Sequence, residues 1–427
     1  SGNHSFREVS VPAFTENAAH EEVDAVFFDA DGDGDQDLYV VSGGSEFGSD
    51  LEKFADRLYI NEGMSGDTIN FSLSDGLPSD YTSESCVRPA DFDNDGDMDL
   101  FVGGRSVPGE YGKPANSYLL ENDGKGNFSD VTSKYMTQVS KIGMVTDAVW
   151  SDYDNDEDLD LIVVGDWMPI TIFENRGDFF QRQFDVPGLG RTEGWWESIA
   201  PADLNGDGNM DFITGNLGTN SMFKASEGSP VKLYVNDFDR NGSLDHVYAF
   251  KQEDRFIPYH LKKPMGRQLS FIEAKFPKFE DYADKSMSEI FSKEQLDNAL
   301  QLTAYQLHSV AVINNGDGTF SIKKLPKEAQ YAPVFDTATD DFDRDSRKEL
   351  LLTGNFSGTR PREGFYLANH GALFDINEDG SLTNIDYSTS GLWIRGDVRD
   401  TEIIKTNTGK LLVIGKNDGQ TEIYAYD

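Results

Sequence analysis

The stretch Asp29-Ala30-Asp31-Gly32-Asp33-Gly34-Asp35-Gln36-Asp37 places an acid at every second position. Five further stretches repeat this spacing of oxygen-bearing side chains. They run Asp91-Phe-Asp93-Asn-Asp95-Gly-Asp97-Met-Asp99, Asp152-Tyr-Asp154-Asn-Asp156-Glu-Asp158-Leu-Asp160, Asp203-Leu-Asn205-Gly-Asp207-Gly-Asn209-Met-Asp211, Asp237-Phe-Asp239-Arg-Asn241-Gly-Ser243-Leu-Asp245 and Asp341-Phe-Asp343-Arg-Asp345-Ser-Arg347-Lys-Glu349. These six loops, numbered 1 to 9 along each, hold 26 of the 76 Asp and Glu residues of the chain.

The sequence around each loop also repeats. A short apolar run follows the loop at once, as in Leu38-Tyr39-Val40-Val41 and Leu100-Phe101-Val102. A turn of small residues, a further strand and a tight Gly hairpin such as Asn122-Asp123-Gly124 come next. Short runs of β-branched and aromatic residues bounded by turn signals favour antiparallel strands. Each unit is therefore predicted to form four short antiparallel strands.

We predict an all-β fold, a seven-bladed β-propeller of four-stranded antiparallel blades, in which 1–427 is a single domain. Radial stacking buries such sheets without leaving long free edges. The seventh unit, from about Gly391 to Asp427, keeps the strands but lacks an acidic loop. The N-terminal Ser5–Val9 stretch resembles an outer strand and is expected to complete the last blade.

One segment interrupts the repeat, from about 252 to 306. Its apolar residues have helical spacing, and Ser286 with Glu289 before Ile290 has the form of a capping box. We predict a small helical insertion within blade five, on the face opposite the acidic loops. It is either a helical cap or part of a binding surface.

The loop pattern predicts calcium sites. Ca²⁺ takes six to eight oxygen ligands, and the side chains at positions 1, 3 and 5 of a curled loop converge on one ion. The carbonyl at position 7 and the carboxylate at position 9 complete the shell, so every odd-numbered loop residue is a predicted ligand. An EF-hand is excluded because position 12 is Val40, Val102, Val163 or Thr214 rather than Glu. Mg²⁺ is less suitable because it retains its waters, and Zn²⁺ is unsuitable because it would require His or Cys ligands, which the loops lack.

The loops are not expected to be equally good sites. The first, second and fourth have the full pattern. The third has Glu157 and the sixth has Ser346 at position 6, where Gly would ease a left-handed turn. The fifth has fewer carboxylates and should bind more weakly. We expect up to six structural Ca²⁺ ions.

These loops and their flanking strands resemble the FG-GAP/VCBS calcium propellers, a fold also seen in integrin α-chain heads. A narrower resemblance is to Bacteroidetes surface proteins that carry ASPIC/UnbV domains. The residues that support it include Asp56-Arg57-Leu58-Tyr59, Gly103 to Gly109, Gly194 to Ile199 and Gly215-Asn216-Leu217-Gly218. The resemblance implies a calcium-binding propeller exposed outside the cell, at the bacterial surface or outer membrane.

Three residues are candidates for ligand binding: Arg105, Trp195 and Trp196. A tryptophan can stack on a sugar ring. Adjacent residues of a strand face opposite ways, so at most one of the two tryptophans lines any single site.

Composition restricts the function. The formal net charge of −39 would repel a nucleic acid, and no apolar run is long enough to cross a bilayer. We predict a non-catalytic, calcium-stabilised surface propeller that binds a protein partner or a glycan at the face opposite the calcium loops. A lipid anchor or a larger outer-membrane assembly would hold it at the surface. The alternative is a carbohydrate-active enzyme resembling a polysaccharide lyase, although no catalytic constellation is evident.

Overall fold

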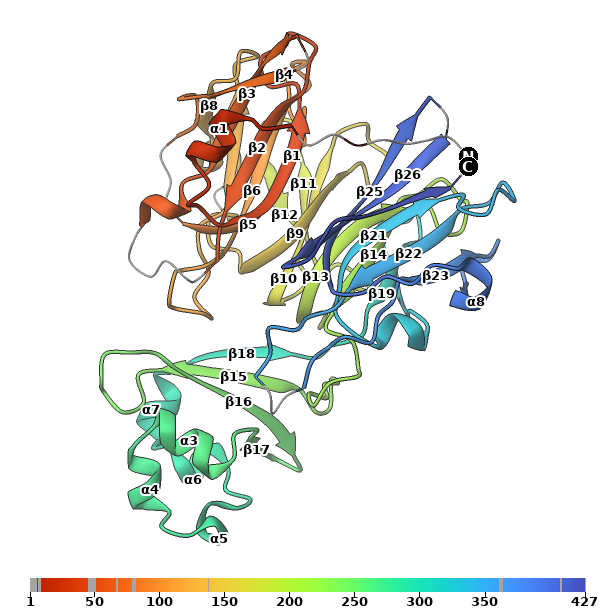
Figure 1. The fold of residues 1–427 in the computed structure, drawn as a ribbon. Helices are drawn as coiled ribbons and strands as arrows, with labels where there is room; N and C mark the ends of the chain where they lie inside the picture. The colour runs from red at the N-terminus through yellow and green to blue at the C-terminus, as the bar shows by residue number, and fades with distance from the viewer. Residues whose placement is uncertain are drawn as a thin grey trace.

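The computed structural model describes residue 6 and residues 9–44, 51–66, 68–78, 82–136, 138–360, 364–407 and 409–426. Antiparallel sheets dominate these residues, and short helices are few (Figure 1). The all-β class predicted from the sequence is confirmed.

Six units of three or four antiparallel strands follow one another around a ring (Figure 1), and strand pairing joins the third and fourth units into one eight-stranded sheet. The first three are β1–β4, β5–β8 and β9–β12, in chain order. Their strands are β1 Glu22–Phe28, β2 Asp37–Ser42, β3 Arg57–Ser65, β4 Thr68–Leu73, β5 Ser83–Ala90, β6 Asp99–Ser106, β7 Tyr118–Asn122, β8 Phe128–Asp130, β9 Met144–Ser151, β10 Asp160–Met168, β11 Thr171–Asn175 and β12 Phe180–Arg182.

The remaining ring sheets are β13-β14-β19-β20, β21–β24 and the three-stranded β25–β27. Their strands are β13 Gly194–Ala202, β14 Asp211–Asn216, β19 Val310–Asn314, β20 Phe320–Lys324, β21 Val334–Asp340, β22 Glu349–Gly354, β23 Ala372–Ile376, β24 Leu382–Ile385, β25 Asp397–Thr406, β26 Gly409–Asn417 and β27 Glu422–Tyr426. Short helices lie outside the sheets: α1 Pro12–Glu16, η1 Leu51–Phe54, α2 Thr132–Tyr135, η2 Lys327–Gln330 and α8 Tyr387–Ser390.

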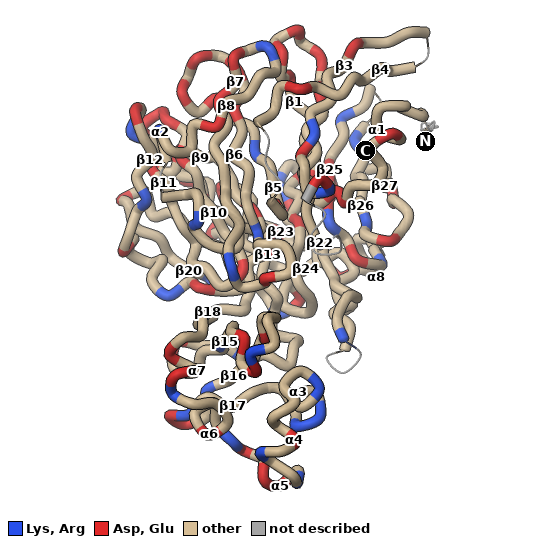
Figure 2. Tube along the Cα trace, turned by 90° about the vertical axis from the view of Figure 1, so that its left-hand side faces the viewer, with Lys and Arg blue, Asp and Glu red and all other residues tan. Residues whose placement is uncertain are grey.

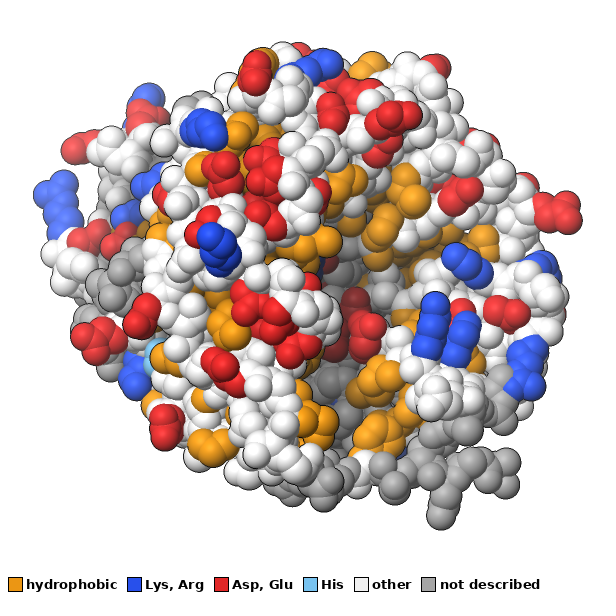
Figure 3. Space-filling model, turned by 90° about the horizontal axis from the view of Figure 1, so that it is seen from above, with side chains coloured by type: hydrophobic (Ala, Val, Ile, Leu, Met, Phe, Trp, Pro, Cys, Tyr) orange, Lys and Arg blue, Asp and Glu red, His pale blue; other side chains and the backbone are white. Residues whose placement is uncertain are grey.

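The first strand of each sheet lies at the centre of the ring. Neighbouring first strands contact one another from β1 through β5, β9, β13 and β21 to β25. Residues of all six line one cavity of about 700 Å³, which we call the axial cavity. Seen from the side opposite the insertion, the molecule surrounds a central hollow (Figure 3). Apolar residues of adjacent sheets fill the space between them, for example Leu100 with Val41 and Phe173 with Phe101.

An insertion separates β14 from β19 and forms a second body below the ring (Figures 1 and 2). It contains a four-stranded sheet in the order β17-β16-β15-β18, with five short helices packed on it. The elements are β15 Val231–Asn236, β16 Asp245–Gln252, β17 Arg255–Pro258, α3 Lys262–Gln268, α4 Phe271–Lys275, α5 Phe279–Tyr282, α6 Met287–Ile290, α7 Lys293–Asp297 and β18 Leu300–Ala304. Within it the Glu289 carboxylate accepts from the Ser286 amide at 2.9 Å, the expected capping contact.

The arrangement of this region differs from the sequence prediction, and seven blades are not confirmed. The prediction took β15–β16 as the start of a fifth blade that continued at Leu307–Val310. Instead β18 pairs with β15, while β19 pairs with β14 of the fourth sheet. Similar strand patterns cannot reveal that one unit is inserted inside another. That 1–427 is a single domain stays a prediction.

The junction between the first and last ring sheets is open enough for a cavity of about 520 Å³, lined by Tyr59 from one side and Arg399 from the other. The Ser5–Val9 stretch, predicted to complete the last blade, lies largely outside the described residues. No described helix has the length and apolar character that a membrane crossing requires.

Candidate functional sites

Each acidic loop joins two antiparallel strands, as predicted. The carboxylate at position 1 accepts backbone N–H groups from later in the loop: Gly32 and Gly34 donate to Asp29 at 2.8 and 3.0 Å. Positions 4 and 6 have positive φ in all six loops, including 75° at Glu157 and 73° at Ser346. Such φ values are costly for non-Gly residues. The strain expected at these two positions is therefore present.

The residue at position 9 begins the second strand and is buried in every loop. Its carboxylate holds the hairpin to the sheet: Asp37 accepts from the Ala30 amide at 2.8 Å and from the Asn61 amide at 2.7 Å. Burial raises the pKa of both Asp99 and Asp160 to about 7, and nearby loop carboxylates add to the rise. Clustered buried carboxylates of this kind are stabilised by a bound cation.

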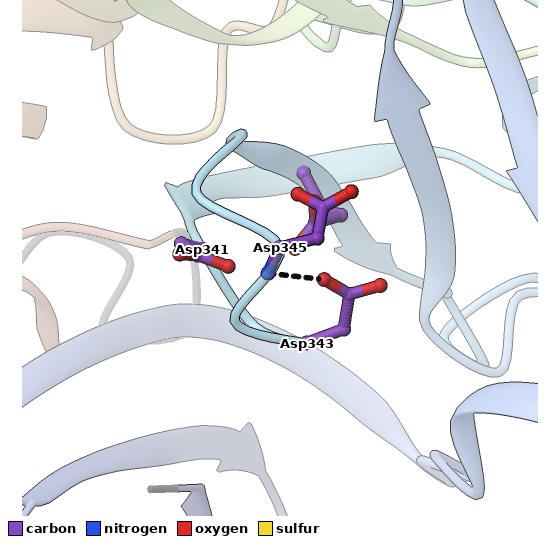
Figure 4. A group of neighbouring side chains, drawn as sticks. Asp341, Asp343 and Asp345 are labelled. Carbon is purple, nitrogen blue, oxygen red and sulfur yellow. Dashed lines mark hydrogen bonds between the residues drawn. The ribbon is translucent and has the colours of Figure 1, made fainter.

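Five loops gather acidic oxygens that lie within 4.8 Å of one another and could hold a metal ion. The groups are Asp29, Asp31 and Asp33; Asp91, Asp93 and Asp99; Asp152, Asp154 and Asp160; Asp237, Asp239 and Asp245; and Asp341, Asp343, Asp345 and Glu349. Figure 4 shows Asp341, Asp343 and Asp345 of the last group, where the Asp345 amide donates to Asp343 at 3.1 Å.

Some loop oxygens are buried without a hydrogen-bond donor among the described residues. They belong to Asp35, Asp97, Asp99, Asp239, Asp341 and Glu349. A buried carboxylate oxygen without a donor is costly, and a hard cation with oxygen ligands removes that cost. The residues present therefore fit Ca²⁺.

Two loops differ from the others in their side chains. In the fourth, position 3 is Asn205, so this predicted ligand is an amide oxygen, and no group of three acids gathers there among the described residues. In the sixth, the Arg347 side chain binds Asp345, its Nε at 2.8 Å from Oδ2. Arg347 can thus supply only its carbonyl as a ligand, as predicted for position 7.

The loops of the ring and the insertion lie at opposite ends of the ring strands. The fourth loop precedes β14, whereas the insertion follows it. Acidic side chains gather around the hollow on the loop side (Figure 3), and many Asp and Glu residues lie on turns of the chain trace (Figure 2). The fifth loop, between β15 and β16, belongs to the insertion itself.

A β-bulge recurs in the first strand of every ring sheet, where the register with the second strand slips by one residue. Bulges re-aim side chains and are common beside functional sites. The skipped residues all line the axial cavity: Val23, Ser85, Thr146, Glu197, Phe335 and Arg399. The five that precede an acidic loop stand six residues before its position 1.

A second cavity, of about 350 Å³, lies where the ring meets the insertion; we call it the junction cavity. Arg105, Glu197 and Arg399 line both this cavity and the axial cavity, so the two meet at these side chains. The insertion contributes Tyr248 and Tyr259 to its wall. The junction cavity thus combines guanidinium groups, a carboxyl group and aromatic rings.

The chain is strained beside this cavity. Trp167 has a φ of 62° at a register slip between β10 and β13, in the pairing that sets Asp166 opposite Trp195. Its indole N–H donates to the Tyr111 hydroxyl at 3.1 Å, and its ring packs edge-on against Trp195. A bulky residue with positive φ persists only where its surroundings hold it, which is common at binding sites.

Charges in the junction cavity are partly paired. Arg105 donates to Asp166 at 3.0 Å, and Asp166 is only 5% exposed. Burial raises the pKa of Glu197 to about 8; Asp166 adds to the rise, whereas Arg105 and Arg399 oppose it. Glu197 is therefore largely protonated at pH 7.

The three predicted ligand-binding residues separate as strand alternation requires. Arg105 and Trp195 line the junction cavity. Trp196 is fully buried in a core cluster, and its N–H donates to the Thr192 carbonyl at 2.9 Å. The sequence reasoning missed Glu197 and Arg399. Glu197 stands six residues before the fourth loop, the same offset as the bulge residue before each of the other four acidic loops of the ring, but the structure is needed to show that this position is a bulge.

The chain contains FG-GAP-like repeats, which match residues 29–102 and 152–214 and include the first four acidic loops. Cartilage acidic protein 1 of Xenopus tropicalis is 26% identical over 214 residues, which are 49% of this chain and 27% of that protein. The chain thus spans about a quarter of the length of this curated relative. The narrower likeness to Bacteroidetes ASPIC/UnbV proteins stays a prediction.

Two solved structures align with most of this chain at low similarity. An Agrocybe aegerita lectin that recognises non-reducing terminal N-acetylglucosamine has 15% identity and a TM-score of 0.33, with 84% of this chain and 81% of that chain covered. A Bacillus licheniformis rhamnogalacturonan lyase has 12% identity and a TM-score of 0.34, with 95% and 71% covered. At such TM-scores, what those proteins bind or cleave says nothing about this chain.

Proposed function

We propose that this chain is a non-catalytic, calcium-stabilised binding module exposed outside the cell, at the bacterial cell surface or outer membrane. Its ligand, a glycan or a protein segment, enters the junction cavity on the face opposite the calcium loops of the ring. A lipid anchor or a larger outer-membrane assembly would hold the module in place. The observation that carries the binding role is the convergence of Arg105, Arg399 and Trp195 on one cavity at the ring–insertion boundary.

The role proposed for calcium is structural. The loops of the ring lie at the strand ends opposite the insertion, so their ions would not contact a ligand in the junction cavity. An ion that binds only the folded loops adds its binding free energy to folding. The buried position 9 carboxylates, which join each loop to its sheet, carry this effect into the core.

A second candidate function has one supporting observation. Glu197, with a pKa near 8 beside Arg105, has the acidity of a general acid or base at neutral pH. A polysaccharide lyase needs a base and a group that neutralises charge at an open site. The chain would then be a carbohydrate-active enzyme on a calcium propeller.

One experiment separates the two candidates. The full chain, saturated with Ca²⁺, is applied to a glycan array, and bound glycans are then incubated with it and assayed for unsaturated products. Binding without product supports the module, provided that Trp195→Phe weakens the binding and Trp393→Phe does not; Trp393 is 39% exposed and is not among the residues that line the junction cavity. Product formation that disappears in Glu197→Gln would establish the enzyme instead. If Trp195→Phe binds the glycan as tightly as the wild type does, the ligand binds outside the junction cavity.

A further inference from the structure

We propose that the junction cavity binds a sugar residue that carries a carboxylate, a uronic acid unit of an acidic polysaccharide. This inference rests on the binding role proposed above and specifies the ligand class. It follows from the imbalance between hydrogen-bond donors and acceptors in the cavity, from its aromatic wall and from its shape.

Two donor groups in the junction cavity lack a full set of acceptors. The Trp195 indole N–H is buried, its residue only 8% exposed, and has no acceptor among the described residues. Arg399 donates through one terminal nitrogen to the carbonyls of Asn355 and Val398, at 3.0 and 2.8 Å. Its other terminal nitrogen is 3.9 Å from Asp397, too far for a strong hydrogen bond. These donors favour a ligand group that only accepts.

The protein carboxyl groups nearby are already engaged or neutral. Asp166 accepts from both Nε and Nη2 of Arg105, at 3.3 and 3.0 Å. Asp397 accepts from the Ser357 amide and hydroxyl, at 2.8 and 2.6 Å. Glu197 is protonated at neutral pH and can itself donate. Asp397, the carboxylate 3.9 Å from Arg399, is therefore held by Ser357 instead, and a ligand carboxylate could pair with Arg399 in the fork geometry that Arg prefers.

The surroundings of Arg399 orient its guanidinium group for contact with a carboxylate. Its guanidinium lies 4.1 Å from the ring centre of Phe335 and 5.8 Å from that of Phe356, and such stacking orients the fork. Both Arg399 and Phe335 are bulge residues, aimed into the cavities by the same register slip as Glu197. Two arginines at one site are conspicuous in a chain of net charge −39.

The remaining wall fits a sugar. Trp195, Tyr248 and Tyr259 line the cavity with aromatic surface, against which the C–H faces of a pyranose pack. A volume of about 350 Å³ is enough for one or two sugar rings. Because Arg105, Glu197 and Arg399 line both cavities, the axial cavity lies directly beside the proposed sugar site.

The test measures binding of a galacturonic acid trisaccharide and of its carboxyl-reduced, galactose counterpart to the full chain by calorimetry, in constant Ca²⁺. The acidic sugar should bind about tenfold or more tighter, because a charge-assisted hydrogen bond contributes more than a neutral one. Equal affinity for the two sugars would overturn the inference without any variant being needed.

Variants of Arg399 test whether this residue causes the preference for the acidic sugar. Arg399→Gln should lower affinity for the acidic sugar about tenfold and leave the reduced sugar within twofold, whereas Arg399→Lys keeps the charge and should lose less. Arg182→Gln is the matched control, because Arg182 also lies over a phenylalanine ring but stands on the outer strand β12. A loss for both sugars alike in Arg399→Gln would contradict a carboxylate contact.

The outcomes also separate the two proposals. If the reduced sugar binds as well as the acidic one and both are lost in Trp195→Phe, the chain is a glycan-binding module and the carboxylate inference is wrong. If neither sugar binds to folded protein, the carboxylate inference is equally wrong, and the binding role then depends on the glycan array alone.

Discussion

Removal of calcium should lower the thermal stability of this chain by an amount that the five acidic groups allow us to estimate. A ligand present at about 100 times its dissociation constant stabilises the folded state by about 2.7 kcal/mol per site. The entropy of unfolding is about 2.1 cal/mol/K per residue, or about 0.9 kcal/mol/K for 427 residues that unfold together. Each site then raises the midpoint by about 3 °C, and five raise it by about 15 °C.

The assay is thermal unfolding followed by circular dichroism, with the protein first in excess Ca²⁺ and then in a strong chelator. Mg²⁺ added to the chelated protein should restore little, because it seldom uses all-protein cages. Asp93→Asn should remove one site and reduce the calcium-dependent shift by about 3 °C. Asp123→Asn, in a Gly hairpin outside the six loops, is the control for loss of one charge. An unchanged midpoint in chelator would refute a structural role for calcium in the loops.

Three further predictions concern the cavity and the core. The pKa of Glu197 is raised when folded, so the folded state retains this proton to higher pH and its stability falls as pH rises from about 4.5 to about 8; Glu197→Gln should therefore match the wild-type midpoint at about pH 4, where Glu197 is protonated in both states, and exceed it at pH 9. Arg105→Gln should cost about 1–3 kcal/mol because it leaves the buried Asp166 unpaired, and adding Asp166→Asn should recover most of that loss in denaturant titrations. Trp196→Ala should cost about 3–5 kcal/mol, whereas Trp393→Ala, at a ring that is 39% exposed, should stay within about 1 kcal/mol; equal losses in the same titrations would contradict the core assignment.

The local structure of each repeat could be predicted from the sequence because short-range chemistry determines it. Alternating carboxylates separated by residues that reach positive φ specify a curled hairpin, and Asp29 accepts hydrogen bonds from within its own loop. The residue at position 9 has to be both acidic and buried, and Asp37 is both. These features depend on nine consecutive residues and so recur wherever the pattern does.

The insertion of one four-stranded unit between β14 and β19 of another could not be predicted from local sequence. Whether β15 pairs with β18 or continues into β19 depends on contacts between residues about 70 to 100 positions apart. Both alternatives have similar apolar strands with Val and Leu at the pairing positions. The acidic loop between β15 and β16 made this inserted sheet look like a further blade, although it lies outside the ring.

The residues of the junction cavity could be predicted only in part. Arg105 and Trp195 could be singled out from the sequence, but Arg399 stands almost 300 residues from Arg105 and its unit has lost the acidic loop. The bulge that aims Arg399 into the cavity follows from strand register, which the sequence pattern alone does not fix. The separation of Trp195 from Trp196 did follow from strand alternation.

The position of the bulge explains how one fold combines rigidity with a variable site. Every ring sheet has the same register slip, yet the skipped residue is Val23, Ser85, Thr146, Glu197 or another side chain. The loops that hold the strands lie six residues away, so a change at the bulge leaves the carboxylate groups untouched. Because the repeated backbone feature does not constrain the side chain it presents, the centre of the ring can acquire a binding site without loss of the calcium-stabilised scaffold.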